Sequence, residues 1–129
     1  MNTTLPGFAD LGVPAALVDS LSQRGITSPF PIQAKTLPDT LAGRDVLGRG
    51  KTGSGKTLAF ALPLVARLHG VRRTPNRPTG LVLAPTRELA TQITATLEPL
   101  AQAAGLTVTT IFGGVAQSRQ VSALRAGAD

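Results

Sequence analysis

The sequence contains no cysteine, tryptophan or tyrosine, and it has only four phenylalanines, one methionine and one histidine. Without cysteine, neither a disulfide nor a thiolate metal site can form, as is typical of proteins in a reducing cytoplasm. The shortage of aromatic residues predicts a core of Leu, Val, Ile and Ala. The single His69 precedes Gly70 with no partner cluster around it, which indicates a helix end rather than a metal ligand or a base.

Long apolar runs are also missing. No run is long enough to span a membrane, and the start "MNTTLPGFADLG" lacks the basic and apolar regions of a secretory signal. We therefore expect a cytoplasmic protein with no membrane partner. The 129 residues, 42% hydrophobic and 16% charged, suit one folded domain of ordinary size.

Acidic residues are scarce. Lys and Arg number 13 against 7 Asp and Glu, a formal charge of +6. This favours a polyanionic partner such as nucleic acid, although many small proteins are basic. The cluster Arg72, Arg73 and Arg77 is compatible with an RNA patch, but we interpret it as a solvated loop.

Apolar spacing predicts alternating strands and helices. Pro29 and Pro31 predict an extended loop before the second helix. The expected helices lie near Leu17–Leu21, Ala34–Leu41, Lys56–His69, Leu89–Ala104 and Ala116–Ala126, and the expected strands at 45–50, 80–86 and 106–112. The run 80–86 is continuously apolar, which predicts burial on both faces. The order indicates an α/β fold with a parallel sheet and flanking helices.

One turn carries most of the chemical information. The stretch "GRGKTGSGKTL" (Gly48–Leu58) fits the phosphate-binding loop G-x-x-x-x-G-K-[ST]. Glycines allow backbone N–H groups to converge on a phosphate, the lysine reaches the β- and γ-phosphates, and the threonine hydroxyl suits Mg²⁺. A plain connecting turn is the alternative, but a strand before and a helix after favour nucleotide binding. The predicted nucleotide-binding residues here are Gly50, Lys51, Thr52, Gly53, Ser54, Gly55, Lys56 and Thr57.

Three further stretches carry a family resemblance. "GITSPFPIQ" (Gly25–Gln33) resembles the Q motif of DEAD-box RNA helicases, with Phe8 where that family has an isolated upstream aromatic. "APTRELATQ" (Ala84–Gln92) is similar to motif Ia, and Gly113–Gly114 is similar to the GG motif. The motifs follow the family order along the whole chain. The resemblance implies a phosphate-loop NTPase fold of the RecA-like type.

The resemblance also implies roles for individual residues. Gln33 would read adenine, because a carboxamide can pair with its N6 and N7 edge. Phe8 would stack on the base. Lys56 and Thr57 would hold ATP and Mg²⁺. The RNA backbone would contact Pro85, Thr86, Arg87, Gly113 and Gly114. RNA, as a single strand or a short duplex, is the implied partner.

Each of these residues also has a simpler interpretation. Gln33 would otherwise cap the helix after the prolines, and Phe8 would be a packing aromatic. Arg87 and Glu88 would form a weak surface pair, and the two glycines a plain turn. The match to the surrounding motifs makes us prefer the family roles.

The chain departs from the family pattern at three places. Gly50 stands where the family usually has Ala, and Phe30 where it usually has Thr or Ser, which removes one hydroxyl contact to the phosphate loop. No D-E-A-D or S-A-T follows, and the carboxylates after the loop are Glu88, Glu98 and Asp129. We therefore expect no catalytic residue in this chain. Since strands that lie between those present would come later in such proteins, we also expect a gap in the sheet and uncertain independent folding.

The sequence thus predicts the N-terminal piece of an ATP-dependent RNA helicase, truncated before the DEAD motif and monomeric in its full-length form. Residues 1–34 would form a segment with the Q motif, and residues 35–129 a partial RecA-like ATP-binding domain. Two other functions stay open: a phosphate-loop ATPase or kinase acting on another substrate, and a non-enzymatic module that binds nucleotide or RNA.

Overall fold

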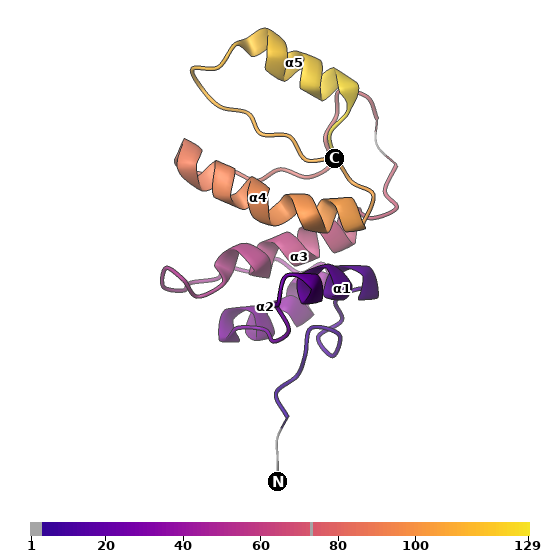
Figure 1. The fold of residues 1–129 in the computed structure, drawn as a ribbon, viewed down its shortest axis with the longest axis vertical. Coiled ribbons are helices and arrows are strands. Elements are labelled where there is room, and N and C mark those ends of the chain that lie inside the picture. Colours follow the sequence, from indigo (N-terminus) through magenta and orange to yellow (C-terminus); the bar gives the residue numbers. More distant parts are fainter. Residues whose placement is uncertain (1–3, 73) are drawn as a thin grey trace.

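A computed structural model describes residues 4–72 and 74–129 of the chain. Arg73 of the arginine cluster and residues 1–3 of the predicted N-terminal segment lie outside this description. In the described part, the helices are α1 (Ala15–Gln23), α2 (Pro31–Leu41), α3 (Lys56–Leu68), α4 (Arg87–Ala103) and α5 (Gln117–Ala126). Helix α3 packs against both α2 and α4, and α1 packs against α4 (Figure 1).

The helices form because their apolar residues recur on one face. Leu17 and Leu21 of α1 are buried, as are Leu62 of α3 and Leu97 and Leu100 of α4. All belong to one core cluster that also includes Phe8, so the N-terminal segment and the later helices share a core. Helix α5 has no buried residue and lies apart from the other helices (Figure 1). The aliphatic core and the predicted helices are confirmed.

The start of α2 corrects one prediction. The two prolines were expected to keep residues up to 33 in an extended loop, but α2 begins at Pro31. Proline is favourable in the first helical position because its missing N–H would have no partner there and its φ is already helical. Phe30, with φ −75° and ψ 159°, is therefore the N-cap residue, and Gln33 lies within the first turn.

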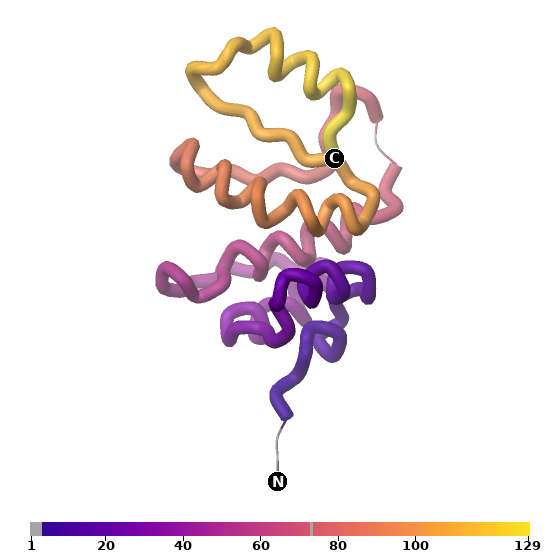
Figure 2. Tube along the Cα trace, in the orientation of Figure 1, coloured from indigo at the N-terminus to yellow at the C-terminus, as the bar shows by residue number. Residues whose placement is uncertain are grey.

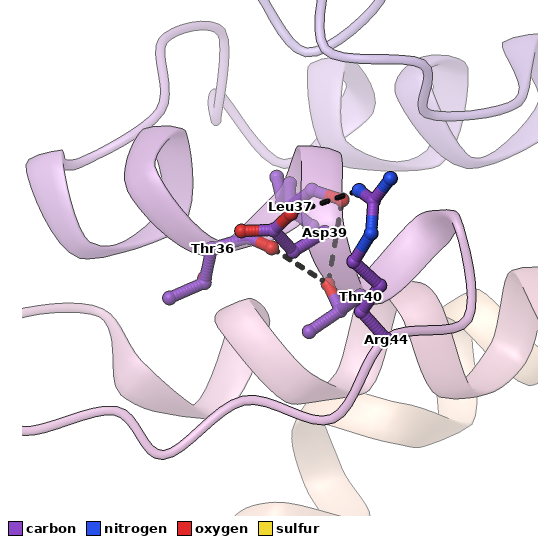
Figure 3. A network of polar contacts seen from close by, with 5 residues as sticks. All are labelled: Thr36, Leu37, Asp39, Thr40 and Arg44. Atoms are coloured by element: carbon purple, nitrogen blue, oxygen red, sulfur yellow. Dashed lines mark hydrogen bonds and ion pairs between the residues drawn. The ribbon is translucent and has the colours of Figure 1, made fainter.

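A small polar network closes the other end of α2 (Figure 3). The Thr40 hydroxyl donates to the carbonyl oxygens of Thr36, at 3.1 Å, and Leu37, at 3.4 Å. After the turn, Arg44 Nη1 donates to Asp39 Oδ1 at 3.0 Å in an exposed ion pair. The chain then continues through residues 45–50 to the glycine-rich turn.

The segments predicted as strands are extended but unpaired. The described residues contain no strand ladder, only an isolated antiparallel bridge between Thr74 and Arg77. The main-chain carbonyl of Asp129 accepts from Gly80 N, and Asp129 N donates to Thr107 O, both at 2.8 Å. Asp129 thus stands between segments 80–86 and 106–112, which both start near the C-terminus (Figure 2). Residues of both segments, together with residues of α3 and α4, line a cavity of about 290 Å³.

The prediction that 80–86 is buried on both faces is wrong. Val82 and Ala84 pack against the core, whereas Leu81 and Leu83 are 79% and 84% exposed. Leu47, in the segment before the glycine-rich turn, is fully exposed. A strand needs a neighbour about 4.8 Å away to pair its backbone and cover its second face. The expected gap in the sheet is therefore present in the described structure.

Candidate nucleotide and RNA-backbone sites

The glycine-rich turn has the backbone of a phosphate cradle. Gly53 and Gly55 have φ values of +81° and +84°, which L-residues with side chains avoid. Gly55 is the N-cap of α3 and supplies no side chain to its first N–H groups. These donors and the positive end of the helix dipole are available to an anion. The turn at the start of α3 thus has backbone geometry that suits a phosphate, and phosphate binding there stays a prediction.

Two of its glycines have side chains packed closely against them. A Cβ at Gly50 would lie 2.6 Å from Ser54 Oγ, and one at Gly55 would lie 2.5 Å from Gln33 Nε2. The family usually has alanine at position 50. In this chain glycine leaves room there for the Ser54 hydroxyl. The Ser54 Oγ is buried and has no hydrogen-bond partner, so it is available to a ligand in the loop.

The polar side chains of the loop suit a nucleotide phosphate. Lys56 Nζ donates to Gly50 O at 2.7 Å across the loop. A phosphate oxygen would compete for this ammonium because it carries negative charge. Thr57 is the second residue of α3 and partly buried. Its hydroxyl fits a Mg²⁺ ion that takes its other ligands from phosphates and water. Residues 4–72 and 74–129 include no group of three or more His, Cys, Asp or Glu suited to a metal.

Gln33 connects the Q-motif segment to the phosphate loop. It is 2% exposed. Its Oε1 accepts from Phe30 N, and its Nε2 donates to Gly55 O, both at 2.9 Å. Gln33 therefore caps α2, the simpler of the two roles considered from the sequence, and it also holds the N-cap of α3. Reading adenine would use the second lone pair of Oε1 and the second N–H of Nε2, and the base would have to reach this buried amide.

The two phenylalanines of this region have opposite surroundings. Phe8 is 2% exposed and belongs to the core cluster, so its ring would have to move to stack on a base. Phe30 is 52% exposed, and its ring edge lies 2.6 Å from the position that a Cβ on Gly55 would take. The aromatic side chain exposed beside the phosphate loop is therefore Phe30. Stacking by Phe8 stays a prediction.

The residues predicted to contact RNA come together at the start of α4. Thr86 is the N-cap, and its Oγ1 accepts from Leu89 N at 3.1 Å. Arg87 is exposed, with its guanidinium carbon 5.1 Å from the centroid of the Phe112 ring. A Cβ on Gly114, where φ is +78°, would lie 3.9 Å from Arg87 Nη1. Pro85 and Gly113 are exposed beside them.

Both groups of residues lie at helix N-termini. The N-termini of α3 and α4 point to the same side of the molecule (Figure 1). Each follows an extended segment, and in open α/β folds ligands bind where such segments end. The sequence motifs predicted both groups of residues but not Phe112. Its contact with Arg87 depends on tertiary structure and has no local sequence signal.

The fold and the loop together define a phosphate-loop nucleotide-binding domain. The family model for the DEAD/DEAH box helicase matches residues 30–129. The chain belongs to this family.

Similar proteins agree with this assignment. The chain is 45% identical to the ATP-dependent RNA helicase RhlB of Sodalis glossinidius (strain morsitans) and 43% identical to RhlB of Escherichia coli (strain SMS-3-5 / SECEC). Each match covers 95% of this chain and 30% of the relative. The chain thus spans about a third of the length of these relatives.

A solved structure supports the fold class. The crystal structure of the RNA helicase Prp28 from Chaetomium thermophilum, bound to ADP, has a TM-score of 0.81 and 37% sequence identity. The match covers 97% of this chain and 31% of that chain. This likeness confirms the predicted RecA-like α/β class, although the extended segments are unpaired here. Within the described residues, no helix is long and apolar enough to cross a membrane.

Proposed function

We propose that this chain is the ATP-binding and RNA-contacting part of a DEAD-box ATP-dependent RNA helicase. The observation that carries the proposal is the phosphate cradle at residues 50–57. It combines two glycines at positive φ, uncapped N–H groups at the start of α3 and the ammonium of Lys56. ATP with Mg²⁺ would bind there, with Thr57 as the protein ligand of the ion.

RNA would bind through its sugar–phosphate backbone at the second group of residues. Arg87 at the start of α4 and the adjacent Gly113–Gly114 turn present a guanidinium and exposed backbone to solvent. Such groups recognise phosphates without reading base sequence. The relatives named above are ATP-dependent RNA helicases, which supports RNA as the nucleic acid.

We further propose that hydrolysis needs acidic residues from outside this chain. Lys56 and Thr57 supply charge and a metal ligand, but neither activates a water molecule as a base. Phe8, Leu62 and Leu100 share one core. The Q-motif segment and the ATP-binding part would therefore differ in function rather than form two separately folded units. We also propose a monomer in the cytoplasm, a location that suits a chain without cysteine.

Titration calorimetry with ATP and Mg²⁺ on the complete gene product tests the nucleotide site. Lys56→Ala should lower the ATP affinity more than tenfold, because it removes the ammonium that reaches across the loop to Gly50 O. Lys35→Ala removes the same charge from an exposed position of α2 and should leave the affinity unchanged. Equal affinities for the Lys56→Ala variant and the natural protein would refute the proposed site.

RNA-stimulated ATP hydrolysis by the same complete product separates the helicase from its rivals. A rise in hydrolysis rate with RNA supports the proposal. ATP hydrolysis that no RNA stimulates would favour another phosphate-loop ATPase. Nucleotide or RNA binding without any hydrolysis would favour a non-enzymatic binding module.

A further inference from the structure

The Arg87 guanidinium lies over an aromatic ring rather than beside an acid. Its carbon is 5.1 Å from the centroid of the Phe112 ring, within the range of a cation–π contact. In the part of the chain that the structure describes, Arg87 has no ion pair with a carboxylate. A ring leaves the guanidinium N–H groups free, whereas a carboxylate would occupy them. The contact therefore orients Arg87 without using its hydrogen-bond donors.

The backbone that carries the Phe112 ring is held by two hydrogen bonds. The Phe112 N–H donates to Gln120 Oε1 of α5 at 2.7 Å. Two residues earlier, the Thr110 hydroxyl is 2.7 Å from the hydroxyl of Thr94, which lies on α4, the helix that begins with Arg87. The segment that carries the ring is thus tied to α4 on one side and to α5 on the other. Gly114 then turns the chain close to the guanidinium.

We propose that Phe112 is a positioning residue that presents Arg87 to an RNA phosphate. This inference rests on the proposed RNA site. An arginine loses considerable side-chain freedom when it is immobilised by a ligand. A ring that restricts it beforehand reduces this loss, so the same contact binds more tightly. Phe112 would raise RNA affinity without touching RNA.

A double-mutant cycle on the complete gene product tests the coupling. Phe112→Leu keeps an apolar side chain but removes the ring, and should lower RNA affinity about two- to fivefold. In an Arg87→Gln background the same change should have no effect, because no cation remains to be positioned. An equal loss in both backgrounds, or no loss with Arg87 present, would overturn the proposal.

Fluorinated phenylalanines at position 112 provide a test that keeps the ring size. Fluorine withdraws electrons from the ring face and weakens a cation–π contact in steps. RNA affinity should fall in the order phenylalanine, difluorophenylalanine, pentafluorophenylalanine. A constant affinity across the series would refute the inference even if Phe112→Leu failed to fold.

Two controls separate the possible failures. ATP affinity should stay constant in every Phe112 variant, which shows that the fold is intact. Arg87→Gln alone should weaken RNA binding. If it does not, the RNA site itself is misplaced and the role of Phe112 falls with it. If Arg87→Gln weakens binding but Phe112 variants do not, the RNA site stands and the positioning role alone is wrong.

Discussion

Gln33 is the residue at which the structure and the family resemblance differ most. Each end of its buried amide makes one hydrogen bond within the protein, Oε1 with Phe30 N and Nε2 with Gly55 O. Two roles are therefore distinct: reading adenine directly, and positioning the phosphate loop for any nucleotide. The second role follows from the observed bonds, because Gly55 is the N-cap of α3.

Gln33→Ala separates these two roles. If Gln33 positions the loop, ATP and GTP affinities should fall by the same factor, because both nucleotides share their phosphates. Removal of the buried amide leaves Phe30 N unpaired and takes one of two donors from Gly55 O, which keeps its bond from Ala59 N. It should also lower the free energy of unfolding by about 1–3 kcal/mol. Titration calorimetry with both nucleotides is the measurement. A loss confined to ATP would instead assign adenine recognition to Gln33.

Gly55 and Gly53 form a matched pair in the same loop. Both have positive φ, so an alanine at either should cost about 1–2 kcal/mol of backbone strain. At Gly55 the added Cβ would also lie 2.6 Å from the Phe30 ring, whereas at Gly53 nothing lies within 4 Å. Gly55→Ala should therefore lower the unfolding midpoint in urea more than Gly53→Ala. Equal midpoints would mean that Phe30 and Gln33 move aside freely.

At the scale of the element, the start of α4 combines stability with the proposed RNA contact. Thr86→Ala removes the oxygen that accepts from Leu89 N, and should lower the free energy of unfolding by about 1 kcal/mol. Thr86→Ser keeps that oxygen and should stay close to the natural protein. Chemical unfolding of the three proteins is the measurement. A serine variant as unstable as the alanine variant would show that the hydroxyl does not cap the helix.

Helices were predictable from the sequence because their signals are local. The spacing of Leu89, Ile93 and Leu97 places one apolar face on α4, and Gly105, with φ +72°, follows its end. The start of α2 was missed because Pro31 was interpreted as a breaker, although proline also suits the first helical position. Local patterns define a helix, but they do not always define where it starts.

The other features that the sequence did not predict depend on residues distant along the chain. The apolar run at 80–86 and the β-branched residues of 106–112 indicate strands. Pairing, however, needs neighbouring strands that these patterns do not supply. The phosphate-loop residues were predictable because their motif is continuous. The bond from Gln33 to Gly55, the burial of Phe8 and the ring contact of Phe112 all arise from tertiary packing, which no local signal records.

At the scale of the whole molecule, the extended segments turn some apolar side chains to the core and leave others exposed. Helices α1 to α4 bury Leu21, Leu37 and Leu62 completely, whereas the extended segments leave Leu47, Leu81 and Leu83 largely exposed. Unpaired, apolar, extended segments are sites of edge-to-edge association. The proposed sites are formed by helix N-termini and turns, so their local geometry does not require a paired sheet.

These exposed segments predict how the 129-residue chain behaves on its own. We expect it to self-associate at micromolar concentrations, and light scattering coupled to size-exclusion chromatography measures this. Leu81→Lys with Leu83→Lys should increase the monomer fraction, because the added charges oppose edge pairing. Leu37→Ala is the control at a fully buried position. Unlike the two surface changes, it should lower the free energy of unfolding, by about 2–5 kcal/mol. A natural chain that is monomeric and unfolds in one cooperative transition would contradict this prediction and favour the independent binding module.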